Sequence, residues 1–488
     1  MNHCSTAEER LQMIIPIIAA PKHGLVTQVS RENHVSRQSL YRWKEQAIQA
    51  MKSALGSPMP VEQKNVLLSI LVLNLFLDTH ASYRGIQANL RNNHGIKISL
   101  GTITGIIKEA GKRAQQWMNQ QKADTERVLA LDEQYSSQRG KAYLNVIDVH
   151  SGQVWATIPP VEVDGESWTL VLWYLQEQGI NTSSTVSDGG RAIADALCQT
   201  QRDGRHQRDV WHLFHCAAQV QGRLDRVREA EQHRLEKLQK RAEAEASGKP
   251  LRGKRSKLTI AEQQFQLTQI SSVADGVRYL CQELHTLLEV VVPRFAHNSA
   301  QCLTSVQRYH EIITIVALLD ELALMTSENM QGHIQMLSKH IRLALPEALF
   351  FARQLDAKQD QARHALGSQA MALVAWAWLR RAWLGPTNQE VVQGFDPAWQ
   401  AIAADLFATW DHAVRASSAV ENWHSILRPY LSAHRKLSAG MLALLAVWQN
   451  HCIAPRGVHA GLSPLQRTAS SASVQPWLAA LGYSPLAA

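Results

Sequence analysis

The stretch Arg127-Val128-Leu129-Ala130-Leu131-Asp132 indicates where an α/β core begins. A short apolar run that ends in an acid predicts a buried strand with its carboxylate at the strand end. Two further β-rich runs follow, Lys141–Asp148 and Gln153–Ile158, and Ser151-Gly152 forms a turn between them. The three runs predict an antiparallel meander with tight turns.

The next segment alternates between helical and strand patterns. Glu166–Gln178 predicts an amphipathic helix, and Thr185–Ser187 predicts a central strand leading to Asp188. Arg191–Cys198 restarts a helix, and Val210–Phe214 predicts one more short strand. Antiparallel strands, a helix and then parallel strands make an α/β layer pattern.

The N-terminal region predicts a helix-turn-helix motif. Leu25–Ser30 and Ser36–Ala47 are the two helices, with Ser36 as the N-cap of the second. Polar residues on the outer face of that helix are expected to contact bases and phosphates. They are Arg37, Gln38, Ser39, Arg42 and Lys44.

A second pair of helices, Tyr83–Asn92 and Ser99–Arg113, repeats this pattern. A plain helical hairpin is the alternative for each pair, but two in tandem before a basic chain favour DNA binding. The formal charge of the chain is +8, and its pI is about 9.2. Lysine and arginine gain free energy by displacing counterions from phosphates, so a polyanionic partner is expected.

Composition excludes several other classes of protein. Hydrophobic residues make up 45% of the 488 residues, enough to build large cores. The six cysteines form no C-x-x-C pair, which is typical of reduced thiols rather than a disulfide framework. No apolar run reaches the roughly 18 residues of a membrane helix. We therefore expect a cytoplasmic, nucleoid-associated bacterial protein.

Three acids stand in surroundings that suggest metal-dependent chemistry. Asp132 and Asp188 each close a strand, and Glu421 lies in a helical segment far along the chain. Carboxylates at strand ends and on a helix can converge on one point. Phosphodiester cleavage needs such a group of oxygen ligands, because it commonly uses two metal ions about 3.5–4 Å apart.

The chain resembles the RNase H-like Asp-Asp-Glu transposases of bacterial insertion sequences, in the subgroup with an α-helical insertion between the second Asp and the Glu. The matching stretches are Leu131-Asp132-Glu133, Val186–Gly190 and Val420–Arg428. The resemblance implies an α/β catalytic core, that is, a mixed sheet flanked by helices. It also implies a large all-α insertion and N-terminal helix-turn-helix domains.

The resemblance also implies roles for individual residues. Asp132, Asp188 and Glu421 would be the catalytic residues and the ligands of two Mg²⁺ ions, with Mn²⁺ as an alternative. Arg428 would lie near a DNA phosphate. Asp209 and His212, in Asp209-Val210-Trp211-His212, match an acid-x-x-histidine motif and would be accessory residues of the active site.

The expected domains follow from these assignments. They are a helix-turn-helix domain at 1–55, a second helical domain at 60–124, the first part of the core at 125–220, an all-α insertion at 221–405, the final part of the core at 406–455 and a tail at 456–488. The expected partners are double-stranded DNA, both terminal inverted repeats and target, and further copies of the chain in a homodimer or a larger homo-oligomer.

Alternatives remain open at this stage. A nuclease or resolvase of the same fold would hydrolyse DNA without joining it, and a transposase-derived regulator would bind DNA without catalysis. The presence of all three acids argues against the regulator.

Asp148, at a neighbouring strand end, could lie near the site as an outer group. A zinc site at His212, His215 and Cys216 is a weaker alternative because no paired C-x-x-C accompanies it.

Overall fold

The structure is a computed structural model. It describes residues 6–19, 22–55, 61–123, 125–200, 205–248, 257–289, 302–367, 369, 371–376, 394, 396–414, 417–434, 436–457, 459–468 and 474–483. The chain is a mixed α/β protein in which one five-stranded sheet is surrounded by helices. It separates into two compact units, the first containing Met1–Leu71 and the second Val72–Ser484.

The first unit has a small helical core. Helices α1 (Ala7–Ala19), α2 (Leu25–Glu32) and α3 (Arg37–Leu55) pack around Ile17, Val29 and Leu40. Ser36 caps α3 as the sequence predicts, since its Oγ accepts a hydrogen bond from the Ser39 amide at 3.0 Å. On α3, Arg37, Gln38 and Arg42 are exposed, whereas Ser39 and Lys44 are half-buried.

The sheet of the second unit has the order β3-β2-β1-β4-β5. Strands β1, β2 and β3 form an antiparallel meander, and β4 and β5 run parallel to β1. The strands are β1 (Arg127–Tyr135), β2 (Lys141–Asp148), β3 (Val154–Glu162), β4 (Thr182–Ser187) and β5 (His206–Arg208). The predicted meander and central strand are thus confirmed.

The two faces of the sheet carry different helices. Leu129 and Leu131 of β1 pack with α7 (Gly165–Glu177) and α8 (Arg191–Gln199) on one face. Because side chains alternate along a strand, Ala130 and Asp132 point to the opposite face. Helix α17 (Ser418–Ala433) contacts β1 and β2 there, and α18 (Ala439–His451) contacts β3.

Strand β3 lies at the edge of the sheet, and α18 covers part of that edge. The side-chain amide of Asn450 accepts from the Val154 amide at 2.7 Å and donates to the Val154 carbonyl at 3.0 Å. This buried pair satisfies backbone groups that an edge strand would otherwise leave open. Pro159 and Pro160 further along β3 have no backbone N–H, which is typical of an edge strand.

Three helices precede the sheet: α4 (Val61–Asp78), α5 (Tyr83–His94) and α6 (Leu100–Asn119). Ser82 and Ser99 cap α5 and α6, and Gly95 ends α5 with a φ of 66°. Helix α6 packs closely on α18, since a Cβ on Gly111 would lie 2.8 Å from the Gly440 backbone.

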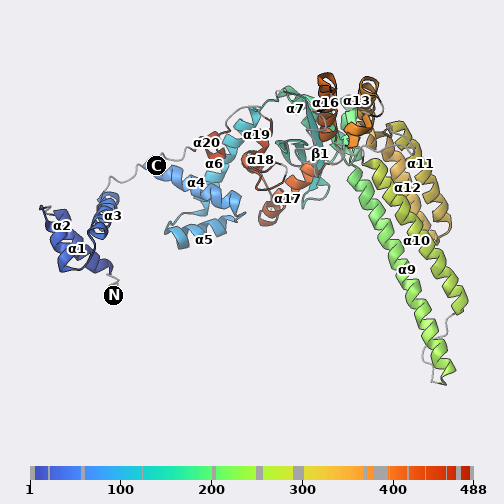
Figure 1. Cartoon of the computed structure of the whole chain (residues 1–488), viewed down its shortest axis with the longest axis horizontal. Coiled ribbons are helices and arrows are strands. Elements are labelled where there is room, and N and C mark those ends of the chain that lie inside the picture. Colours follow the sequence, from blue (N-terminus) through green and yellow to red (C-terminus); the bar gives the residue numbers. More distant parts are fainter. Residues whose placement is uncertain are drawn as a thin grey trace. The chain divides into compact units, whose positions relative to one another are not determined.

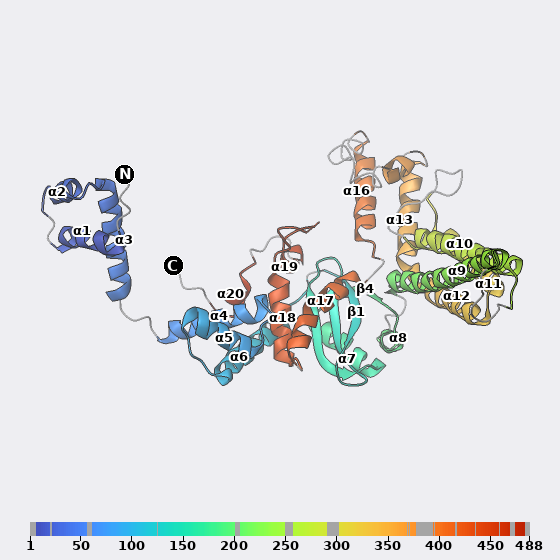
Figure 2. The same ribbon diagram turned by 90° about the horizontal axis from the view of Figure 1, so that it is seen from below.

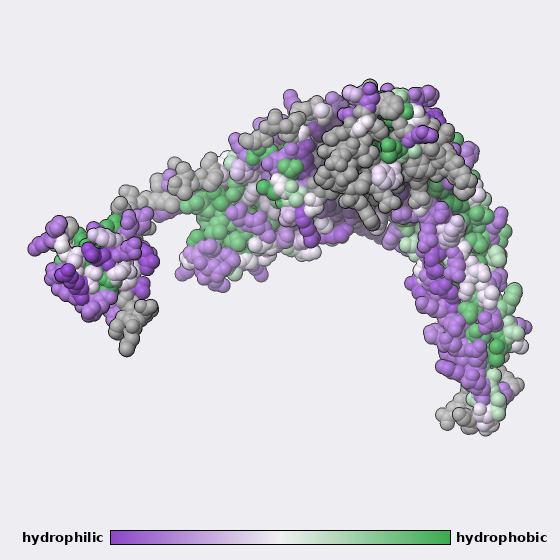
Figure 3. Space-filling model, viewed as in Figure 1, coloured by the Kyte–Doolittle hydropathy of each residue, from purple (hydrophilic) through white to green (hydrophobic). Residues whose placement is uncertain are grey.

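A helical segment separates β5 from α17. Helices α9 (Val210–Ala246), α10 (Ile260–Leu288), α11 (Ser305–Leu324) and α12 (Glu328–Ala348) lie side by side (Figures 1 and 2). Figure 3 shows that the visible surface of α9 is mostly hydrophilic. Helices α13 (Phe350–Leu366) and α16 (Pro397–His412) follow. The boundary expected at 220–221 falls inside α9.

One predicted element is wrong. Val210–Phe214 is the first part of α9 rather than a strand, and the strand β5 precedes it at His206–Arg208. The cause is Asp209, whose carboxylate accepts a hydrogen bond from the Trp211 amide at 2.7 Å. Such an N-cap satisfies a free amide of the first helical turn and therefore favours helix at this position.

The C-terminal part of the described chain adds two short helices, α19 (Pro464–Thr468) and α20 (Trp477–Ala480). In the described part of the chain, no helix has both the length and the apolar character that crossing a membrane requires.

Candidate functional site

Asp132 and Asp188 stand at corresponding places on adjacent parallel strands. Ala130 of β1 pairs with Val186 of β4, and each acid lies two residues beyond that pair. A two-residue step returns a side chain to the same face of a strand, and neighbouring strands lie about 4.8 Å apart. The local sequence fixes the second acid further, because Asp188 Oδ1 accepts a hydrogen bond from the Gly190 amide at 2.7 Å.

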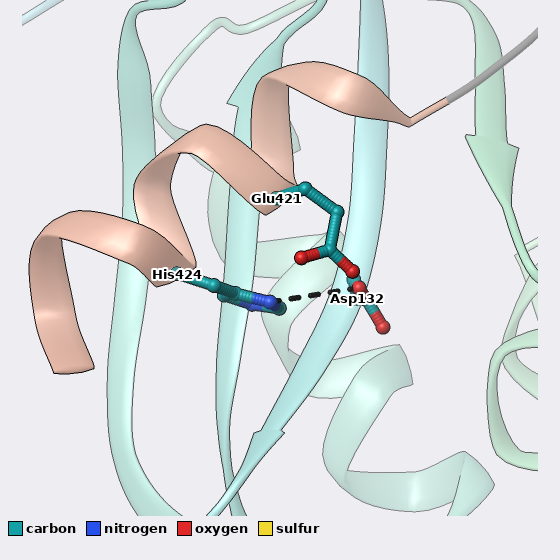
Figure 4. A group of neighbouring side chains, drawn as sticks. All are labelled: Asp132, Glu421 and His424. Atoms are coloured by element: carbon teal, nitrogen blue, oxygen red, sulfur yellow. Dashed lines mark ion pairs between the residues drawn. The ribbon is translucent and has the colours of Figure 1, made fainter.

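Helix α17 brings Glu421 and His424 to Asp132. These two residues are three positions apart, so they share one face of the helix. One potential ligand atom from each of Asp132, Glu421 and His424 lies within 4.8 Å of the other two (Figure 4). Asp188 is outside this group of three, but its charge is close enough to influence the pKa of Asp132.

The electrostatics of the site disfavour a full set of bare negative charges. Burial raises the pKa of Asp132 to about 8, and the charges of Asp188, Glu133 and Glu421 add to this rise. Burial also raises the pKa of Glu133, which points to the opposite face and accepts a hydrogen bond from Trp168 Nε1 at 2.7 Å. A bound cation would relieve this repulsion.

The protonation of His424 follows from its neighbours. Trp423 Nε1 and the Thr157 hydroxyl both donate to Asn145 Oδ1, at 3.0 and 2.8 Å, which fixes the orientation of the Asn145 amide. Asn145 Nδ2 must therefore donate to His424 Nε2, 3.1 Å away. Burial lowers the pKa of His424 to about 4, so the ring is neutral and carries its proton on Nδ1.

This tautomer decides which atoms can hold a metal. His424 Nδ1 lies 3.7 Å from Asp132 Oδ2, which is longer than a hydrogen bond. A protonated nitrogen offers no lone pair, so in this tautomer the His424 ring offers no ligand atom toward Asp132. The remaining donors are carboxylate oxygens of Asp132, Asp188 and Glu421, which suit a hard cation such as Mg²⁺.

Two other predicted site residues contact α17 or the residue before it, and His212 contacts Trp211. Arg428 is on α17, and its Nη2 lies 3.5 Å from Glu421 Oε2. Asp209 is buried; one carboxylate oxygen caps α9, and the other accepts from the Ser417 amide at 2.9 Å, directly before α17. His212 is half-buried and packs edge-on against Trp211.

Two further expectations concern acids and histidines. Asp148 pairs across the sheet with Leu129, whereas Asp132 pairs with Asn145, so Asp148 lies toward the other end of β1. Its Oδ1 accepts from the Ser151 amide at 2.7 Å, which makes it a turn residue. Among the described residues, His212, His215 and Cys216 form no group of three with convergent ligand atoms.

Sequence reasoning missed His424 and Asn145. The three-residue spacing of Glu421 and His424 on one helix was a usable signal, because it places both side chains on one face. Asn145 carried no such signal. Its role depends on contacts to Trp423 and Thr157, which only the folded chain brings together.

Comparison with known proteins gives no family assignment: no protein-family model matches this chain, and no curated protein matches it either.

Proposed function

We propose that this chain is a DNA transposase with an RNase H-like catalytic core of the Asp-Asp-Glu type. The observation that carries the proposal is the convergence of acids from distant parts of the sequence. Asp132 lies within β1 and Asp188 directly follows β4, each two residues beyond the paired Ala130 and Val186, and Glu421 reaches Asp132 from α17. One such acid has many structural explanations, whereas Asp132 and Glu421 with convergent oxygens, and Asp188 near enough to influence the pKa of Asp132, favour a catalytic site.

The strand order supports the same proposal. An antiparallel meander β3-β2-β1 continued by parallel strands β4 and β5 is the mixed sheet expected of an RNase H-like core. The helical segment α9–α13 lies in the sequence between Asp188 and Glu421, where the resembling transposases carry their insertion. Fold alone does not define function, so the proposal depends on the acids.

The donor atoms fit Mg²⁺ or Mn²⁺. Asp132, Asp188 and Glu421 would hold the ions, and a bound cation would offset both the burial of the Asp132 carboxylate, which is the main cause of its raised pKa, and the neighbouring negative charges. When bound, such ions activate an attacking oxygen and stabilise the leaving oxygen of a phosphodiester. The Glu133 amide donates to Asp132 Oδ1 at 2.8 Å, and His424 lies beside the other carboxylate oxygen, with its Nδ1 3.7 Å from Oδ2.

The remaining residues have roles in binding DNA. Arg428 is half-exposed beside Glu421, where its guanidinium can contact a phosphate next to the scissile bond. Arg37, Gln38 and Arg42 are exposed on α3 and would contact a terminal repeat. Cleavage at an end of the element would release a 3′-hydroxyl, and attack of that hydroxyl on target DNA would join the strands. Bringing two DNA ends together requires at least a dimer.

The direct test uses purified protein and DNA that carries the ends of its own element, taken from the flanking inverted repeats. We expect Mg²⁺-dependent cleavage at the ends and joined products with target DNA. Asp188→Ala should retain DNA binding and lose cleavage. Asp164→Ala removes an exposed acid that caps α7, and it should cleave like the wild type.

The outcomes separate the alternatives. Cleavage without joined products would identify a nuclease of the same fold. DNA binding without cleavage by the wild type would identify a regulator. If Asp188→Ala still cleaves, the assignment of the site is wrong.

A further inference from the structure

The helical insertion contacts the strand that lies next to the Asp188 loop. Strand β5 pairs with β4, and Thr185, Val186 and Ser187 align with His206, Gln207 and Arg208. All three β5 side chains interact with the region where α12 ends and α13 begins. Gln207, which is fully buried, donates to the Ala348 carbonyl at 2.9 Å and accepts from the Phe351 amide at 3.1 Å.

A chain of polar contacts runs from α12 to the loop after β4. Glu347 Oε2 lies 3.4 Å from His206 Nδ1, and His206 Nε2 lies 2.8 Å from Ser187 Oγ. Ser187 Oγ in turn accepts a hydrogen bond from the Gly189 amide at 3.0 Å. Gly189 is the residue after Asp188, so the contacts that begin at Glu347 end on the backbone that carries the acid.

A second contact reaches the same loop. Arg208 Nη1 lies 3.7 Å from Glu347 Oε2, and its guanidinium packs against Gly189. A Cβ on Gly189 would overlap Arg208 Nη1 at 1.0 Å, and Gly189 has a φ of 69°. The positive φ favours glycine at this position, and the absence of a side chain leaves room for the Arg208 guanidinium against the loop.

The Ser187–His206–Glu347 arrangement has the order of a nucleophilic triad, but burial excludes that use. Ser187 has no exposed surface and His206 is 4% exposed, so a substrate cannot reach the hydroxyl. The hydroxyl is also engaged by the Gly189 amide. These groups therefore fix the position of the loop.

We propose that Glu347, in the helical insertion, is a positioning residue for Asp188 and acts through His206, Ser187 and Arg208. The location of the α12–α13 junction then determines where the second acid of the site stands. An effect of Glu347 on catalysis rests on the proposed function. The claim that Glu347 holds the Asp188 loop in position concerns the fold alone.

The test measures hydrogen–deuterium exchange of the peptide 185–192 in the full chain. Glu347→Ala should accelerate exchange of the Gly189 amide by about tenfold, since its acceptor loses a charge-assisted support. Glu347→Gln keeps an acceptor for His206 and should give a smaller increase. The control is Asp320→Asn, which breaks an ion pair with Arg342 between α11 and α12 and should leave the loop unchanged.

Unchanged exchange of the loop in Glu347→Ala would overturn the proposal. If Glu347→Ala accelerates exchange throughout the second unit, Glu347→Gln decides: an increase confined to 185–192 supports the proposal and a uniform one overturns it. A Mn²⁺ titration of the same proteins separates this inference from the proposed function. A loosened loop that binds Mn²⁺ as tightly as the wild type would show that Asp188 is no ligand, which overturns the function and leaves the positioning intact.

Discussion

At the scale of single residues, Asp132 is the group whose environment differs most from water among the proposed ligands. Its side chain is 16% exposed, and burial with three neighbouring acids raises its pKa to about 8. The unfolded chain would have a pKa near 4 at this position. Asp132 therefore stabilises the fold below about pH 4, and that contribution is lost as the pH rises through 8.

This loss of stability with rising pH gives a prediction for the metal-free protein. In EDTA, the melting temperature of the wild type should fall between pH 4 and pH 8, and Asp132→Asn should be about 1–3 kcal/mol more stable than the wild type at pH 9. Mg²⁺ should stabilise the wild type and have little effect on Asp132→Asn. Thermal unfolding followed by circular dichroism measures both effects. Equal pH profiles for the two proteins would contradict the assigned environment of Asp132.

Some residues of the candidate site could be located from the sequence and others could not, for a physical reason. The apolar runs before Asp132 and Asp188 predicted the strands, but Asp132 lies inside β1 and not at its end, whereas Asp188 directly follows β4. Glu421 came from a motif on a helix. His424, Asn145 and Glu347 could not be assigned, because their roles come from hydrogen bonds between segments that only the fold brings together.

At the scale of elements, Asp209 joins two helices that matter to the site. It caps α9 and also accepts from the Ser417 amide, directly before the helix that carries Glu421. Local sequence predicted a strand after Asp209, because Val210–Phe214 is apolar and short enough for one. The segment is helical because Asp209 accepts from the Trp211 amide in a part-buried region, where an unpaired donor is costly.

The double role of Asp209 predicts a cost larger than that of a cap. Asp209→Ala should destabilise the protein by about 2–4 kcal/mol, because a cap and a buried acceptor for Ser417 are lost together. Asp164→Ala removes an exposed cap of α7 and should cost only about 1 kcal/mol. Urea denaturation compares the two. Similar losses for both would show that the link to Ser417 contributes little.

The contact between α6 and α18 gives a second prediction at this scale. Gly111→Ala would place a methyl group 2.8 Å from the Gly440 backbone, so the helices must separate. We expect a loss of about 2 kcal/mol or more, because backbone atoms cannot move aside as a flexible side chain can. Gly105→Ala on the same helix meets no atom within 4 Å and should stabilise the protein by about 0.5–1 kcal/mol. Thermal melts that rank the two variants in the opposite order would contradict the close crossing.

At the scale of the whole molecule, the proposed function assigns DNA binding and metal binding to different units. The first unit presents basic residues on α3, and the second contains the acids on the sheet and α17. Periodicity and capping residues predicted the helices of the first unit and the meander of the second. They could not predict how α12 and α13 meet β5, because that contact depends on packing between segments with no shared pattern.

This division predicts that DNA affinity and metal affinity can be changed separately. Replacing Arg37 and Arg42 with alanine should lower the slope of log Kd against log salt by about 1.8, since each lost phosphate contact accounts for about 0.9. Metal binding by the second unit should stay unchanged. As a control, Lys358→Ala with Arg363→Ala removes the same charge from α13, where both cations pair with acids. Fluorescence anisotropy with a terminal-repeat duplex at several salt concentrations gives the slopes. A control pair that lowers the slope as much as the α3 pair would mean that net charge, and not the face of α3, determines binding.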